Sequence, residues 1–158
     1  MMCRRMLALL VALGCVALAA APSAHAQEPT IVTDITFPEG GEPFGTFTAL
    51  DPLCPSGTFV DQFVGGGGAF RSDRVFYGAS TVRKMFTCAD GTGTFTILFH
   101  PQFTPGTSEG CEQAGPFAVI GGTGDYAQLR GRGDFCVFGV GEDEVRETFT
   151  GRFRTRLG

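Results

Sequence analysis

The chain has 158 residues and carries 12 basic side chains (Lys and Arg) against 16 acidic ones (Asp and Glu), which gives a net charge of −4 at pH 7. This acidic balance argues against a nucleic-acid partner, because nucleic-acid recognition requires a basic face. With only 2 histidines, the sequence also argues against a multi-histidine metal centre, and it predicts neither a metal site nor a cofactor.

The N-terminal residues have the three parts of an export signal. Arg4 and Arg5 form a positive end, residues 7–21 form an apolar run, and Ala24 and Ala26 frame a small-residue cleavage site. The apolar run is shorter than the roughly 20 residues that span a membrane, and no second apolar run follows it. We therefore expect residues 1–26 to be a signal peptide and residues 27–158 to be one secreted domain, with no membrane partner after cleavage.

The rest of the chain is expected to form strands rather than helices. Gly, Pro and Thr interrupt every window before the apolar spacing of an amphipathic helix can develop. Short runs of alternating Phe, Val, Ile and Thr instead predict strands over residues 30–37, 44–50, 57–64, 69–77, 81–88, 94–100, 116–120, 132–140 and 145–157. Between them, residues 65–68 (four glycines) are interpreted as a flexible connector, and Asp90-Gly91 predicts a hairpin turn.

Alternation along the strands assigns one apolar face to each of them. The side chains expected to point inward are Phe47, Phe59, Phe63, Phe95, Ile97, Phe99, Phe117, Val119, Phe135 and Val137. Eight or nine short antiparallel strands of this kind predict an all-β barrel or sandwich, and we favour a barrel of about eight strands. The interior of such a barrel holds packed side chains or one small ligand. Since the chain has 16 Phe and no Trp, the Phe rings are expected to form the core.

The cysteines predict two disulfides. Two of the six lie in the expected signal peptide, and the four that remain are Cys54, Cys88, Cys111 and Cys136. An even number of cysteines in an exported chain favours disulfides, and no C-x-x-C pair supports a zinc site. Four cysteines allow three pairings. We favour Cys54–Cys88 with Cys111–Cys136, because the second pair brackets one expected hairpin.

The most specific motif is VIGGTGDYAQLRG over residues 119–131. It resembles the G-G-T-G-x-[FY]-x-x-x-R-G hairpin of dirigent proteins and of the allene oxide cyclase barrel-like family. Residues 88–95 (CADGTGTF) resemble a turn in small secreted bacterial members of that group, and residues 148–152 (TFTGR) resemble their closing strand. The resemblance covers about half of the chain. It implies an eight-stranded antiparallel barrel of calycin-like type and a homo-oligomer, commonly a trimer.

The hairpin motif has a structural and a catalytic interpretation. Its structural residues are Gly121, Gly122, Thr123, Gly124 and Gly131, because glycines allow the chain to reverse tightly and backbones to approach closely.

By resemblance, an acid near this turn and the Arg of the R-G pair line the barrel cavity, which makes Asp125 and Arg130 the candidate catalytic residues. The alternative, which we favour, is that these two residues form an ion pair on a surface hairpin, contributing less than about 1 kcal/mol.

Three functions follow from these expectations. The first, towards which the sequence leans, is a non-enzymatic module that binds a small apolar molecule in the barrel. The second, implied by the resemblance, is a cyclase, isomerase or dirigent-like protein that guides ring closure or coupling of an apolar substrate. The third is a structural or inhibitory secreted protein with a filled barrel. An interior without a pocket above roughly 300 Å³ would leave only the third. A pocket with Asp125 and Arg130 at its wall would favour the second, and one lined by Phe, Val, Ile and Thr the first.

Overall fold

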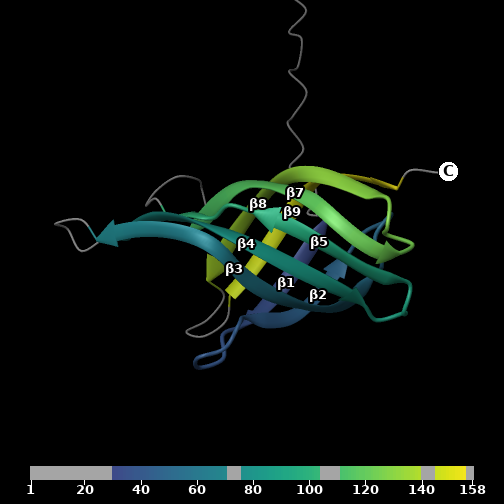
Figure 1. The fold of residues 1–158 in the computed structure, drawn as a ribbon, viewed down its shortest axis with the longest axis horizontal. Helices are drawn as coiled ribbons and strands as arrows, with labels where there is room; N and C mark the ends of the chain where they lie inside the picture. Colours follow the sequence, from purple (N-terminus) through teal and green to yellow (C-terminus); the bar gives the residue numbers. More distant parts are fainter. Residues whose placement is uncertain (1–29, 71–75, 104–110, 140–144, 156–158) are drawn as a thin grey trace, which may run out of the picture.

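The computed structural model describes residues 30–70, 76–103, 111–139 and 145–155 (Figure 1). The expected signal peptide, residues 1–26, lies outside the described residues. The described residues form a single antiparallel sheet of nine strands. The strands are β1 (Ile31–Thr36), β2 (Phe44–Ala49), β3 (Ser56–Phe70), β4 (Phe76–Cys88), β5 (Gly93–Phe99), β6 (Gln102–Phe103), β7 (Gln113–Gly124), β8 (Leu129–Gly139) and β9 (Val145–Thr155). Within the described part of the chain, no helix is long and apolar enough to cross a membrane.

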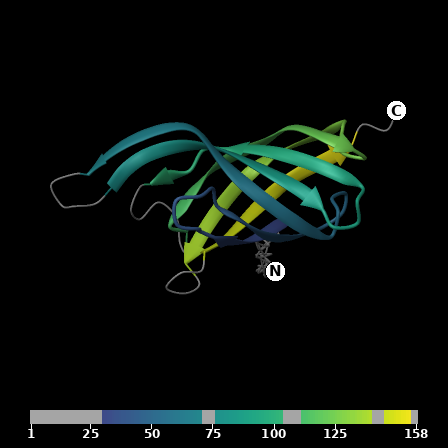
Figure 2. The ribbon, with the colours of Figure 1, turned by 60° about the horizontal axis from the view of Figure 1, so that its bottom comes forward.

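The sheet closes on itself into a barrel. Strand β1 pairs with both β2 and β9, and β3 pairs with β4, so the ring runs β1-β2-β3-β4-β5-β7-β8-β9 and back to β1. The short β6 pairs with the same two neighbours as β5 and extends it after a break at His100 and Pro101. The expected antiparallel barrel of eight strands is therefore confirmed, and Figures 1 and 2 show the strands wrapping around a common interior.

Two predictions for residues 65–77 are wrong. Residues 65–68 are not a connector, because they lie within β3 and pair with β4, from Gly65 opposite Thr81 to Gly68 opposite Gly78. Residues 69–77 are not one strand, because Phe70 pairs with Phe76 and the chain has reversed between them. The backbone ladder needs no side chains, so a glycine run can continue a strand wherever a partner strand supplies the hydrogen bonds. Both ribbon views show β3 and β4 extending beyond the rest of the barrel (Figures 1 and 2).

Phenylalanine rings fill the middle of the barrel. The rings with at most 3% exposure are Phe47, Phe59, Phe86, Phe95, Phe99, Phe117, Phe135 and Phe149. Phe149 is central, because its ring meets those of Phe86, Phe99, Phe117 and Phe135 at centroid distances of 5.4–6.4 Å. Each fully buried ring contributes about 2–3 kcal/mol, so the expectation that Phe forms the core is confirmed.

Phe63 follows the inward alternation of β3 and lines the mouth of the barrel, but it is not buried. Its side chain is 61% exposed, although its partner across the ladder, Val82, is buried. The register shifts immediately after Phe63, where β3 leaves the body of the barrel, and none of the described strands covers the ring. The other inward assignments are confirmed by the burial of their side chains.

The favoured disulfide pairing is confirmed. Cys54 bonds Cys88 across a Cα–Cα distance of 5.9 Å, and Cys111 bonds Cys136 across 5.4 Å. The first disulfide ties the segment before β3 to the end of β4, and the second ties the segment before β7 to β8. Each joins two segments that the barrel brings together. Each also closes a loop in the unfolded chain, which lowers the conformational entropy of the unfolded state.

The turn between β4 and β5 allows a test of the backbone geometry. Gly91 has φ +75°, and Asp90 Oδ1 accepts hydrogen bonds from the backbone N and Oγ1 of Thr92 at 3.0 and 2.6 Å. We expect Gly91→Ala to lower the free energy of unfolding by about 1–2 kcal/mol, because an L side chain is strained at this φ. Gly67→Ala is the matched control, since its φ is not in this region and no atom lies within 4 Å of its added Cβ. Urea unfolding measures both, and equal effects would contradict the assignment of the turn.

Candidate functional site

A cavity of about 200 Å³ opens at one end of the barrel, and we name it the mouth cavity. Its apolar walls include Ile35, Val82, Phe99 and Val137, and exposed rings of Phe37 and Phe63 stand among its lining residues. The acidic side chains of Asp61 and Glu147 also line it, although each residue is at most 5% exposed. The cavity is smaller than the 300 Å³ lower bound typical of ligand sites, so it excludes ligands of drug size. By volume alone it meets the condition that was set for the third function, a protein with a filled barrel.

A buried ionic cluster lies beside this cavity, and we name Asp61, Lys84 and Glu147 the triad. Lys84 Nζ lies 2.8 Å from Asp61 Oδ2 and 2.9 Å from Glu147 Oε2, and the lysine side chain is 0% exposed. The Oγ1 of Thr33 donates a hydrogen bond to Glu147 Oε2 at 3.1 Å. The ammonium group also lies 3.7 Å from the centroid of the Phe59 ring, where the negative face of the ring attracts a cation.

The period of the strands places the triad inside. Lys84 lies between the inward positions Val82 and Phe86 of β4, and Asp61 is its direct partner on β3. Glu147 occupies an inward position of β9, where Thr33 of β1 is its direct partner. The ammonium group of Lys84 therefore links β4 to the neighbouring β3 and also to β9, which lies on the other side of the ring.

The triad has one positive and two negative groups in an environment that excludes water. Burial raises the pKa of the Asp61 carboxyl to about 6, the nearby Lys84 charge lowers it, and the charge of Glu147 raises it further. The second oxygen of this carboxyl, Oδ1, is buried and has no hydrogen-bond partner among the described residues. Asp61 lines the mouth cavity, and so does Ser80, whose buried Oγ also has no hydrogen-bond partner among the described residues. Both groups are therefore placed to meet a molecule that enters the cavity.

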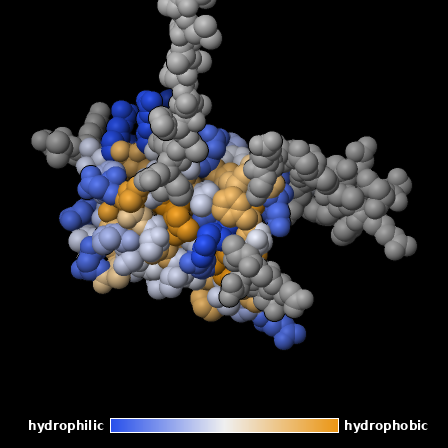
Figure 3. All heavy atoms as spheres, turned by 180° about the vertical axis from the view of Figure 1, so that it is seen from behind, coloured by the Kyte–Doolittle hydropathy of each residue, from blue (hydrophilic) through white to orange (hydrophobic). Residues whose placement is uncertain are grey.

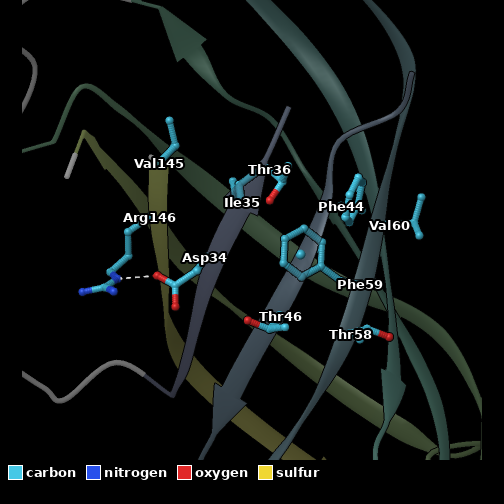
Figure 4. Close-up of a pocket in the computed structure, with 11 residues that line it drawn as sticks. Asp34, Ile35, Thr36, Phe44, Thr46, Thr58, Phe59, Val60, Val145 and Arg146 are labelled. Carbon is cyan, nitrogen blue, oxygen red and sulfur yellow. Dashed lines mark hydrogen bonds and ion pairs between the residues drawn. The ribbon is translucent and has the colours of Figure 1, made fainter. Parts of the chain in front are cut away.

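A larger hollow of about 730 Å³ lies on the outer surface over β9, β1, β2 and β3 (Figure 4). Asp34 and Arg146 form an ion pair of 2.7 Å there, and both side chains are about half exposed. The outward side chains of Phe44 and Val60 add apolar surface. The molecular face opposite to the view of Figure 1 likewise mixes apolar and hydrophilic areas (Figure 3). An exposed ion pair contributes little, and this groove holds no buried polar group that could direct chemistry.

The two residues expected from the hairpin motif lie elsewhere. Asp125 is exposed in the turn after β7, and Arg130 is exposed near the start of β8, where its Nη1 donates to the backbone oxygen of Leu129 at 2.9 Å. Neither lines the mouth cavity, and no ion pair joins them among the described residues. The turn lies beside Gly93 at the start of β5, whereas the cavity lies beside Phe99 at its end.

The glycines of the motif have a structural place. Gly121, Gly122, Thr123 and Gly124 continue β7 and pair with β5, beyond the end expected at residue 120. Gly124 has φ +57°, and a Cβ there would clash with the backbone oxygen of Thr92. Gly131 lies in β8, where a Cβ would come 2.7 Å from the Phe153 ring. The hairpin also buries Tyr126 and Leu129 against the core.

The sequence interpretation missed the whole triad. The alternation that assigned the inward Phe residues also runs through Asp61, Lys84 and Glu147, but only apolar positions were followed. A usable signal was present, because Lys84 is the single lysine of the chain and stands between two inward apolar residues. The described residues contain no group of three side chains suited to hold a metal ion.

Comparison of the chain with family models, with curated proteins and with solved structures found no match. The fold and the site therefore define the protein by themselves: a closed antiparallel barrel of eight strands with a Phe-filled middle, and a small cavity at one end beside a buried ionic triad.

Proposed function

We propose that this protein binds a small, largely apolar molecule in the mouth cavity without transforming it, although the volume of the cavity is below the 300 Å³ that was set as the condition for a ligand site. The observation that carries the proposal is the buried Asp61 Oδ1, which lacks a partner among the described residues and belongs to a carboxyl in an otherwise largely apolar cavity. A volume of about 200 Å³ equals that of roughly seven water molecules, so the ligand is of single-ring size. A hydroxyl on the ring would give Asp61 its missing hydrogen bond, which favours phenols and cyclic alcohols.

Ligand-observed NMR with phenol and cyclohexanol, against benzene and cyclohexane, tests this proposal. We expect saturable binding of the two hydroxyl compounds with dissociation constants of about 1 mM or below, and weaker binding of the two hydrocarbons. Val137→Phe should abolish binding because it fills the cavity, whereas Val60→Phe, on the outer face of β3, should leave it unchanged. Absence of binding by every probe would leave the third function, a structural or inhibitory protein with a filled barrel.

A second function has its own supporting observation. A carboxyl whose pKa burial raises to about 6, beside a lysine and a small, largely apolar cavity, is suited to transfer protons near neutral pH. This favours the cyclase or isomerase alternative, with Asp61 in place of Asp125 and Arg130. The test is exchange of the α-hydrogens of cyclohexanone for deuterium, followed by NMR in D₂O. Acceleration by the protein that Asp61→Asn removes would support proton transfer, and an unchanged exchange rate would support binding alone.

We also propose that the protein is secreted after cleavage at residue 26 and that it forms a homo-oligomer, a trimer by resemblance. The two disulfides support an oxidising compartment. Native mass spectrometry of protein purified from culture medium measures the N-terminal residue, the subunit number, both disulfides and any retained ligand together. We expect a chain that begins at Gln27. A full-length monomer with free thiols would contradict this proposal.

A further inference from the structure

Four arginines stand together on the outer face of β8 and β9, at the end of the barrel away from the mouth cavity. Arg130 is the direct ladder partner of Arg154, and Arg132 is the direct partner of Arg152. All four side chains are exposed, and we name them the arginine cluster. Figure 2 shows the end of β9 at the same end of the barrel as the turn between β7 and β8.

The cluster concentrates positive charge on an acidic chain. It holds four of the 12 basic residues of a chain whose net charge is −4. Like charges directly opposite each other on neighbouring strands are destabilising, and this surface has two such pairs in succession. Among the described residues, no carboxylate forms an ion pair with any of the four; Asp134, on the next outward position of β8, pairs with none of them.

The surface around the arginines is hollowed. One hollow of about 460 Å³ lies between Arg130 and Arg154 and is completed by Gln128 and Thr155. A second hollow of about 380 Å³ is lined by all four arginines and by the Phe153 ring. The two arginine pairs are two residues apart along each strand, a separation of about 6.7 Å. Each pair can direct guanidinium N–H groups at one oxyanion, the geometry in which arginine binds phosphate and sulfate most strongly.

We propose that the arginine cluster is a binding site for a ligand with two neighbouring phosphate or sulfate groups, one held by Arg130 and Arg154 and the other by Arg132 and Arg152. Binding removes the repulsion within each pair, so the ligand also stabilises the folded protein. This site is independent of the mouth cavity and of any ligand there.

The test uses inositol hexakisphosphate and inositol hexakissulfate, which carry oxyanions on adjacent ring carbons, in calorimetric titrations of the full-length chain. Inorganic phosphate and inorganic sulfate provide single oxyanions for comparison. We expect one molecule of inositol probe to bind per chain, at least about tenfold more tightly than a single oxyanion. Added salt should weaken binding, because the contacts are exposed. A preference between the two inositol probes identifies phosphate or sulfate as the natural group.

The double variant Arg130→Gln/Arg154→Gln should weaken binding of the inositol probes by about tenfold or more. The double variant Arg83→Gln/Arg146→Gln removes the same charge elsewhere on the outer surface and should leave binding within about twofold. Thermal unfolding of the unliganded variants confirms that both are folded, and only the control should keep the stabilisation by inositol hexakisphosphate. Equal weakening in both variants would reduce the effect to net charge, and no preference over single oxyanions would overturn the two-group site.

Discussion

Replacing Lys84 by methionine is expected to lower the free energy of unfolding at pH 7.5 by about 3–5 kcal/mol. Methionine keeps most of the apolar stem but removes the ammonium group that lies 2.8 and 2.9 Å from two buried carboxylates. Asp61 and Glu147 would then be buried negative charges without a cation. Denaturant unfolding measures the change, and the loss should shrink as the pH falls through about 6, because protonation of the Asp61 carboxyl removes its charge.

Two further variants test whether the loss comes from the buried charges that Lys84→Met leaves without a partner. Arg83→Met removes a positive charge from the next residue of β4, where the side chain points outward and donates a hydrogen bond to Gln62 at 3.1 Å. We expect it to cost at most about 1 kcal/mol. The triple variant Lys84→Met/Asp61→Leu/Glu147→Leu removes the whole triad and should recover most of the loss, since apolar replacement of buried ions is often neutral. A cost for Lys84→Met no larger than that of Arg83→Met would contradict a buried triad.

The second large effect is a stability that depends on pH through Asp61. Burial raises the pKa of this carboxyl from 3.8 to about 6, so between these values the folded state holds a proton that the unfolded state releases. The free energy of unfolding therefore falls as the pH rises through this window, by about 3 kcal/mol in total. The main physical reason is that burial disfavours the charged form of the carboxyl; the nearby Lys84 charge opposes this effect, and the charge of Glu147 adds to it.

Asp61→Asn is the matching experiment, because asparagine has the shape of the protonated acid and does not titrate. At pH 8 the variant is expected to exceed the native protein in stability by up to about 3 kcal/mol, and near pH 4 the two should be nearly equal. The hydrogen bonds from Thr92 lower the pKa of Asp90, which acts with the opposite sign, but they do so in both proteins and cancel in the difference. A constant difference across this pH range would show that Asp61 titrates normally in the folded state.

The strands and their inward faces were accessible from the sequence because both depend on local alternation. Phe95, Ile97 and Phe99 occupy every second position, and such a run has one stable orientation once a core exists. The predictions failed where the local pattern carries no information about the neighbouring strands. Residues 65–68 have no side chains from which a period could be read, and only their pairing with β4 reveals that they are a strand. The exposure of Phe63 depends on where the neighbouring strands end, which the local pattern does not contain.

The candidate site could not be predicted in the same way. Charged residues are assigned to the solvent face because burying one charge alone is very unfavourable. Lys84 is buried with two ion-pair partners: Asp61 on the neighbouring strand, and Glu147, which is 63 positions further along the chain and reaches it from the other side of the ring. Such a contact depends on closure of the barrel, not on local pattern. The hairpin motif, in contrast, could be recognised from the sequence because its residues are adjacent in the chain. Its glycines allow the close approach of backbone segments, and the adjacent Asp125 and Arg130 are exposed to solvent.

The packing of the phenylalanine rings also prevents a small molecule from passing through the barrel. Eight rings with at most 3% exposure fill the middle of the barrel. In the described part of the chain, the mouth cavity is therefore open at one end of the barrel only, and no channel passes through it. A molecule bound in the mouth cavity, as proposed, would have to leave past Phe37 and Phe63, where it entered. Entry and exit of the proposed ligand would share one barrier, so substitutions at these two rings should change both rates in the same direction.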